Sequence, residues 1–225
     1  MYTIYYGTNN VAKVNHMKEI FKNTGISIIG INELNGIDHN IDENGKDPLD
    51  NARIKAKHYY FQINKPVFSI DSGLFFENVE FDDQPGTFVR RVKGKYLNDK
   101  DMIEYYSNLA NKYGGEVIGY YKNAICIIVD DETIVENGSE AINSDKFILT
   151  SIPHKKLVEG WPLDSLSKEI KTGKYCYDIE STGDNAHPII GIKAEQEYLK
   201  IIKQTINNSA LKGLTWPTIQ IFYMT

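Results

Sequence analysis

A carboxylate inside an apolar, strand-like run constrains this chain more than any other feature. Residues 66–76 read PVFSIDSGLFF, and Asp71 is the single ionisable residue among them. The run predicts a buried strand that the Asp-Ser-Gly sequence interrupts with a turn. Because an unpaired charge in an apolar interior costs several kcal/mol, Asp71 should bind a metal, pair with a cation such as Lys55, or serve as a general base with a perturbed pKa. An aspartate that caps a turn at a strand end is the alternative.

The rest of the chain predicts a mixed α/β fold. Apolar residues repeat at helical spacing in three segments and follow strand-like patterns in others, and no internal repeat, linker or change of composition divides the sequence. We therefore expect one domain over residues 1–225. The predicted strands are 3–8, 27–31, 66–76 and a pair within 118–142 joined by a polar turn, the predicted helices are 14–25, 48–64 and 194–206, and residues 215–225 form an edge strand or an arm.

Charge and cysteine content limit the classes of function. The formal net charge of -5 gives no general attraction to a polyanion, which argues against duplex nucleic acid and requires that any phosphate binding come from a local cluster. The two cysteines, Cys126 and Cys176, have neither metal-ligand spacing nor a disulfide pattern. With no signal peptide and no apolar run of about 18 residues, we expect a cytoplasmic protein that does not contact membranes.

Two segments carry residues suited to phosphate chemistry. The sequence GTNNVAK, Gly7 to Lys13, lies between a predicted strand and helix, where backbone N–H groups and an ammonium can converge on an anion. It lacks the spacing of a Walker loop. In DNARIKAK, Asp50 and Asn51 begin a helix and Lys55 lies about one turn later. A capped glycine turn and an exposed charged helix are the respective alternatives.

Two further segments fit the recognition of phosphate and of a nucleobase. The sequence QPGTFVRRVKGK places Arg90 and Arg91 near two lysines after a Pro-Gly turn, in an otherwise acidic chain. In EGWPLDS, Trp161 could stack on a base and Asp164 could read its edge. A solvated basic loop and a packing tryptophan beside a surface turn would give the same patterns.

Taken in order, these segments resemble the inosine triphosphate pyrophosphatase family over residues 1–167. That family opens with a strand and a T-x-N-x-x-K loop, continues with an E-N-A-x-x-K-A helix and a D-D-S-G-L segment, and closes the resemblance with P-G-x-x-x-R and G-F-G-Y-D. The chain is similar at Thr8, Asn10 and Lys13, at Asp50, Asn51, Ala52, Lys55 and Ala56, at Asp71 to Leu74, at Pro85, Gly86 and Arg90, and at Gly160 to Asp164.

The chain departs from the family pattern at four points. Ile70 precedes Asp71 where the family has a second acid, and Asp50 stands where the family has glutamate. Trp-Pro-Leu replaces Phe-Gly-Tyr before Asp164. The C-terminal Ser-His-Arg element is not evident, although His187 lies at a comparable distance after Asp164.

The resemblance implies a fold, a reaction and a set of site residues. The expected fold is an elongated, twisted mixed β-sheet flanked by helices, in two lobes with a central cleft. The expected reaction is the hydrolysis of deaminated or damaged purine nucleoside triphosphates, such as ITP, dITP and XTP, to the monophosphate and pyrophosphate by a homodimer. The implied residues are Asp71, Lys13 and Lys55 for catalysis, Asp71 and Asp50 for Mg²⁺, and Thr8, Asn10, Lys13, Ser72, Arg90, Trp161, Asp164 and His187 for substrate binding.

Two other functions fit the same residues. A nucleotide-binding regulatory protein of this fold, without turnover, is suggested by Ile70 and the missing Ser-His-Arg element. A nucleotidyl- or phosphotransferase could use the same anion-binding loop. Pyrophosphate release separates the first from a hydrolase, and a labelled nucleoside attached to an acceptor would identify the second.

Overall fold

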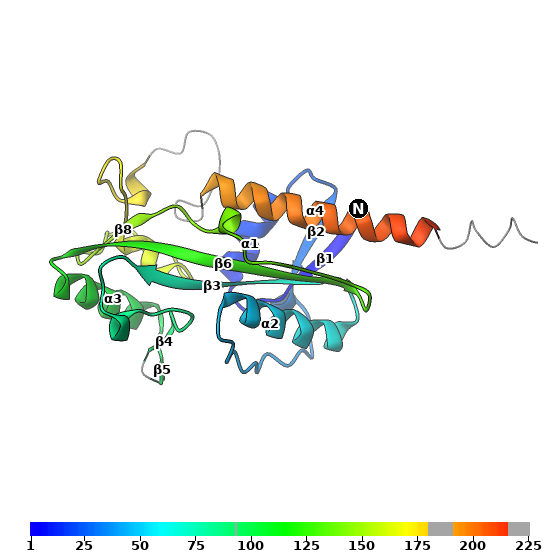
Figure 1. Ribbon diagram of the computed structural model, residues 1–225, viewed down its shortest axis with the longest axis horizontal. Helices are drawn as coiled ribbons and strands as arrows, with labels where there is room; N and C mark the ends of the chain where they lie inside the picture. The colour runs from blue at the N-terminus through cyan, green and yellow to red at the C-terminus, as the bar shows by residue number, and fades with distance from the viewer. Residues whose placement is uncertain (93, 180–190, 216–225) are drawn as a thin grey trace, which may run out of the picture.

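A single long, twisted sheet organises the chain. The computed structural model describes residues 1–92, 94–179 and 191–215. Within them, seven strands form a mixed sheet in the order β2-β1-β3-β6-β8-β9, with β7 also paired to β6 (Figure 1). Strand β1 (Tyr2–Tyr6) lies parallel to both β2 (Ile26–Gly30) and β3 (Val67–Phe76), and β3 pairs antiparallel with β6 (Glu116–Asp130).

Strand β6 carries the sheet from one end of the molecule to the other. Its C-terminal half pairs with β3 and β7 (Thr133–Asn137), and its N-terminal half with β3 and β8 (Phe147–Thr150), beyond which lies β9 (Ser167–Glu169). A separate hairpin joins β4 (Arg91–Val92) to β5 (Lys95–Tyr96). The 3-10 helices are η1 (Ile31–Glu33), η2 (Phe81–Asp83), η3 (Glu140–Ile142), η4 (Pro162–Leu166) and η5 (Cys176–Asp178).

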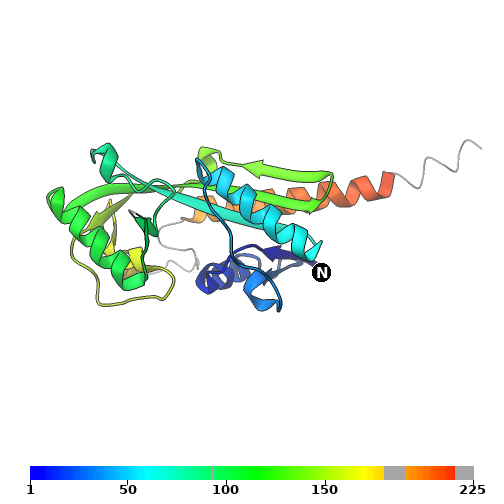
Figure 2. The same ribbon diagram turned by 90° about the horizontal axis from the view of Figure 1, so that it is seen from below.

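Helices cover both faces of the sheet and divide the core into three clusters. Helix α2 (Pro48–Ile63) lies on one face, and α1 (Val11–Ile20) and α4 (Ile192–Thr215) lie on the other (Figures 1 and 2). Helix α3 (Asp99–Lys112) packs with η4 and β8 at the far end of the sheet, around the third cluster. The elongated mixed sheet predicted from the sequence is therefore confirmed.

The predicted elements are largely found, with one correction. Strand β3 is not interrupted at the Asp-Ser-Gly sequence, because Asp71, Ser72 and Gly73 stay in register with Ala124, Asn123 and Lys122 of β6. Ladder pairing satisfies the backbone there, so no turn is required. Helix α3 was not predicted, although Asn98 caps it and its buried Met102 and Tyr106 follow helical spacing. Of the predicted arm, residues 216–225 lie outside the described residues.

Two further expectations from the sequence concern membrane-spanning segments and the cysteines. In the described part of the chain, no helix is both long and apolar enough to cross a bilayer. Cys126 and Cys176 are both buried, and both are free thiols. Burial raises the pKa of each to about 12, so neither thiol is a reactive nucleophile at neutral pH.

Candidate active site

One cavity of about 430 Å³ collects most of the residues selected from the sequence. Its walls come from the loop between β1 and α1, from α2 and β3, from the loop after β3, and from the start of η4. Asp50 does not line it, and His187 lies outside the described residues. The predicted residues that do line it are Thr8, Asn10, Lys13, Lys55, Asp71, Ser72, Arg90, Trp161 and Asp164.

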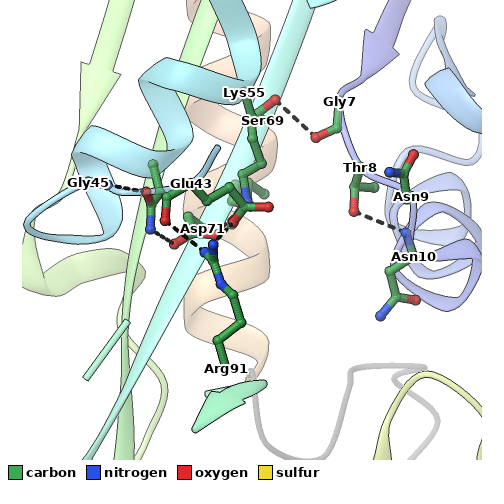
Figure 3. Close-up of polar contacts among 12 residues, drawn as sticks. Gly7, Thr8, Asn9, Asn10, Glu43, Gly45, Lys55, Ser69, Asp71 and Arg91 are labelled. Atoms are coloured by element: carbon green, nitrogen blue, oxygen red, sulfur yellow. Dashed lines mark hydrogen bonds and ion pairs between the residues drawn. The ribbon is translucent and has the colours of Figure 1, made fainter. Parts of the chain in front are cut away.

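The first wall is the N-terminus of helix α1. Asn10 caps this helix, since its side-chain oxygen accepts a hydrogen bond from the Lys13 amide at 3.2 Å, and Thr8 Oγ1 accepts one from the Asn10 amide at 3.2 Å. Gly7 lets strand β1 end close to its neighbour, because a Cβ there would lie 2.3 Å from Ser69 Oγ. The N-terminus of α1, with its partial positive charge, thus lies at the cavity, on the side opposite Asp71 (Figure 3).

The opposite wall holds the buried carboxylate. Asp71 is 8% exposed and forms an ion pair with Lys55, which is 9% exposed. Asn51 Nδ2 donates to the other oxygen of Asp71 at 3.3 Å, and Lys55 Nζ donates to the Ile70 carbonyl at 3.3 Å. The cost of burying Asp71 is offset by these partners, as its place in an apolar run requires.

The structure puts Glu43, and not Asp50, beside this pair. Asn51 and Lys55 are four residues apart and share the face of α2 that meets β3, whereas Asp50 lies on the neighbouring face. There Asp50 pairs with Arg53 at 2.7 Å. A carboxylate oxygen of Glu43 instead lies 3.7 Å from Lys55 Nζ, and Glu43 lines the cavity. The geometry therefore does not support Asp50 as a metal ligand.

Two adjacent arginines reach the cavity from the loop after β3. Arg91 donates to the Glu43 carbonyl at 2.7 Å, and its guanidinium lies 3.8 Å from the Glu43 carboxylate (Figure 3). Arg90 pairs with Asp99 at 2.7 Å while lining the cavity. From the sequence, both arginines were expected in a local positive cluster, but only Arg90 was expected to bind substrate. Glu43 was not expected at all, because nothing in the acidic stretch 38–47 distinguishes it from its neighbours.

Burial, and then the neighbouring cations, perturb the pKa of Lys13. Burial lowers the pKa of its ammonium to about 8, and nearby Lys55 and Arg90 add to the shift, against the opposing effect of Asp71 and Glu43. A lysine in this state responds to an incoming anion, because added negative charge raises its pKa again. The site is thus poised to bind a multiply charged anion.

The far end of the cavity is aromatic. Trp161 and His16 both line it, with ring centroids 6.2 Å apart and planes at 84°. Asp164 is 4% exposed and also lines the cavity. The pKa of the Tyr121 hydroxyl is raised by burial and then by Asp164, so it stays a neutral hydrogen-bonding group. A flat heterocycle with polar edges fits this end.

Comparison with known proteins identifies the family. The model of the Ham1 family matches the chain over residues 4–140, which is more than half of its length. The chain belongs to the Ham1 family. The resemblance found in the sequence motifs is thereby confirmed.

Curated relatives of this Ham1-family chain carry the name dITP/XTP pyrophosphatase. One, from Staphylococcus epidermidis, is 39% identical over 104 residues, which cover 46% of this chain and 51% of the relative. Another, from Leptospira interrogans, is 34% identical over 146 residues, covering 63% of this chain and 70% of the relative. The Ham1-family chain thus matches the S. epidermidis relative over about half of that protein's length.

Solved Ham1 structures share the fold. A HAM1 protein from Coxiella burnetii superposes with a TM-score of 0.68 at 19% identity, covering 91% of this chain and all of the other (100%). The Staphylococcus aureus Ham1 protein gives a TM-score of 0.61 at 21% identity, covering 92% of this chain and 99% of the other. At these identities the comparison supports the fold alone.

Proposed function

We propose that this Ham1-family protein hydrolyses deaminated or damaged purine nucleoside triphosphates, such as ITP, dITP and XTP, to the monophosphate and pyrophosphate. The observation that carries the proposal is one cavity with three parts: a cation-rich helix N-terminus, the Asp71–Lys55–Glu43 cluster and the Trp161 end. These parts suit a triphosphate, its hydrolysis and a base, respectively. The names of the curated relatives point to the same reaction.

The phosphate end would act mainly by positioning and charge. Lys13, Lys55 and Arg91 line the cavity together with Arg90, and their charges would offset the negative charge on the phosphoryl oxygens in the transition state. Thr8 and Ser72 would orient the phosphate chain by hydrogen bonds. Water would attack in line with the departing pyrophosphate, so no covalent enzyme intermediate is needed.

We propose Mg²⁺ as the cofactor, held by Asp71 and Glu43. Carboxylate oxygens are the ligands that Mg²⁺ prefers, and it usually binds through one or two of them plus substrate phosphates and water. Among the described residues no group of three or more acids, histidines or cysteines could hold a metal ion, which fits a site completed by substrate. When bound, Mg²⁺ would withdraw charge from the phosphate oxygens.

The same two carboxylates would orient the attacking water. Ile70 lines the cavity at the position before Asp71, and its apolar side chain can neither orient a water molecule nor bind a metal. Asp71 and Glu43 both border the cavity near Lys55, within reach of one ligand.

At the other end of the cavity, Trp161 would stack on the base and Asp164 would accept hydrogen bonds from its edge. The family resemblance further supports a cytoplasmic homodimer whose ligand is the nucleotide alone.

A panel of nucleoside triphosphates tests the function. Purified protein with Mg²⁺ is expected to release pyrophosphate, without orthophosphate, from ITP, dITP or XTP at least about tenfold more efficiently than from ATP or GTP, as a few polar contacts to a base edge allow. Products are followed by ³¹P NMR. A nucleotide that raises the melting temperature without pyrophosphate release would favour the regulatory alternative, and transfer of labelled nucleoside to an acceptor would favour the transferase.

Lys13 makes anion binding dependent on pH. Its lowered pKa means that the ammonium is charged below about pH 8 and neutral above it in the free protein. We therefore expect the affinity for inorganic tripolyphosphate to fall as pH rises through about 8, with uptake of a proton on binding near that pH. Calorimetry in buffers of different ionisation enthalpy measures the uptake. A Lys13→Met variant should bind more weakly and lose this dependence, and an unchanged pH profile in that variant would refute the assignment.

The lowered pKa of Lys13 also makes the stability of the fold depend on pH, and here the trend is opposite: stability rises with pH, whereas anion affinity falls. Since the pKa of Lys13 is lower in the folded chain than in the unfolded chain, the unfolded chain binds more protons between about pH 8 and the ordinary lysine value. The lysine therefore destabilises the free protein below about pH 8, and this destabilisation is relieved as pH rises above that value. An anion in the cavity should remove the effect.

A further inference from the structure

One glycine residue links the two ends of the cavity. Gly160 immediately precedes Trp161, and its carbonyl accepts a hydrogen bond from Asn10 Nδ2 at 3.0 Å. Its N–H donates to Asp99 Oδ2 at 2.7 Å. Asn10 caps α1 and Asp99 is the first residue of α3, so the peptide groups on the two sides of Gly160 are held by two different helices. We name this arrangement the Gly160 clasp: Asn10, Gly160 and Asp99.

The clasp anchors an otherwise loosely held loop. Residues 155–159 connect β8 to η4 and are all exposed. In the described part of the chain, the hydrogen bonds that join residues 155–160 to other elements are both made by backbone atoms of Gly160. The position requires glycine, because its φ is +82° and a Cβ would lie 2.8 Å from Asn10 Oδ1. The clasp therefore fixes the backbone immediately before Trp161, whose ring also meets His16 edge-on.

Both functional atoms of the Asn10 amide are engaged. The oxygen must face the Lys13 N–H, because an NH₂ group cannot accept that bond, and the nitrogen then faces the Gly160 carbonyl. Asn10 thus holds the start of the phosphate-binding helix and the base platform with the same planar group. Asp99 repeats the pattern, since it holds the Gly160 N–H and also pairs with Arg90 at 2.7 Å.

We propose that Asn10 and Asp99 are positioning residues that set the Trp161 ring at a fixed place relative to the phosphate-binding end of the cavity. On this assignment, which rests on the proposed function for its nucleotide arm, Asn10 contributes to nucleotide affinity through Gly160 and not through the phosphates. Cutting the clasp therefore weakens the binding of a ligand that spans both ends. It leaves unchanged the binding of a ligand that occupies the phosphate end alone.

Two substitutions cut the clasp without removing the helix cap. Asn10→Ser keeps a capping oxygen but is too short to reach Gly160, and Asn10→Asp keeps the length but cannot donate. Asn98→Ser is the matched control, because Asn98 caps α3 through the Asp101 amide and does not line the cavity. Asn10→Ser should lower the affinity for ITP about tenfold, the value of one well-placed hydrogen bond, and leave tripolyphosphate affinity unchanged.

A second readout does not depend on nucleotide binding. The chain has two tryptophans, so in a Trp216→Phe background the fluorescence reports Trp161 alone. Acrylamide should quench Trp161 more efficiently in both Asn10 variants than in the parent or in Asn98→Ser. If the parent neither binds nor cleaves nucleotides, the proposed function fails while the quenching result still decides whether the clasp orders Trp161.

Other outcomes would overturn the proposal. Equal losses of ITP and tripolyphosphate affinity in Asn10→Ser would show that Asn10 acts on the phosphates directly. Quenching and ITP affinity that match the parent in both Asn10 variants would show that the clasp does not position Trp161. Should Asn10→Ser fold poorly, as judged by its melting temperature, the Asn10→Asp variant carries the quenching comparison, which its added charge does not affect through ligand binding.

Discussion

Replacement of Asp71 by asparagine is expected to lower kcat for ITP about a thousandfold with pyrophosphate release as the assay, since a carboxylate that holds charge at the reacting phosphate is lost. The variant should also lose about 3 kcal/mol of stability, because Lys55 remains buried without its main counter-ion. Chemical denaturation measures the second effect. A variant that hydrolyses ITP at the parent rate would remove Asp71 from the mechanism.

A double variant separates the two effects. Combining Asp71→Asn with Lys55→Met removes both charges and places an apolar chain of similar length in the buried site. Since a buried ion pair can be replaced by apolar groups at little cost, the double variant should recover most of the lost stability. Activity should stay lost, because neither the carboxylate nor the ammonium is restored. Recovery of activity together with stability would show that Asp71 matters only for folding.

The second prediction concerns a matched pair of variants, Glu43→Gln and Asp50→Asn. The pair tests whether Glu43, and not Asp50, is a ligand of the proposed Mg²⁺. Glu43→Gln should reduce kcat about a hundredfold and raise the Mg²⁺ concentration needed for half-maximal rate, because one of the two carboxylates proposed to hold the metal is lost. Asp50→Asn should change kcat by less than about threefold, since its carboxylate pairs with Arg53 outside the cavity. Arg53 also keeps Glu136 as a partner at 2.5 Å, which limits the loss of stability.

The result that would contradict this assignment is the reverse pattern. If Asp50→Asn raised the Mg²⁺ requirement and Glu43→Gln did not, the motif-based choice of Asp50 would stand and the cavity seen here would not be the metal site. Titration with Mn²⁺, followed by its electron paramagnetic resonance signal in the absence of nucleotide, gives an independent measure of each variant's metal affinity.

Local sequence signals predicted much of the fold. Helix α2 was expected at residues 48–64 and spans Pro48–Ile63, because a proline near the start and helical spacing of apolar residues act within a few residues of one another. The polar turn at 130–132 likewise placed β6 and β7 correctly. The interruption predicted in β3 was wrong, since pairing with β6 along its whole length outweighs the turn preference of Asp-Ser-Gly.

The site residues also fall into two groups: those that a local sequence pattern predicted and those that depend on the tertiary structure. Asp71 and Lys55 followed from the sequence, because a carboxylate in an apolar run needs a counter-ion wherever that run lies. The contact between Glu43 and Arg91 did not follow, because it joins the loop before α2 to the start of β4, which meet only after the sheet has assembled. Nor could the sequence reveal that Asn10 reaches Gly160, which lies 150 residues further along the chain.

The amino-acid sequence by itself determined the family, the strand–helix–strand–helix–strand order of residues 2–76, and the demand that Asp71 be paired. Periodicity, capping and burial cost act over short stretches of chain and can be read there. Only the tertiary structure decided that Glu43 lies next to Lys55, that Arg91 faces Glu43, and that Asn10 and Asp99 hold Gly160, the residue before Trp161. Those contacts depend on strand register and on loops that approach one another through the packed core, and no local pattern encodes them.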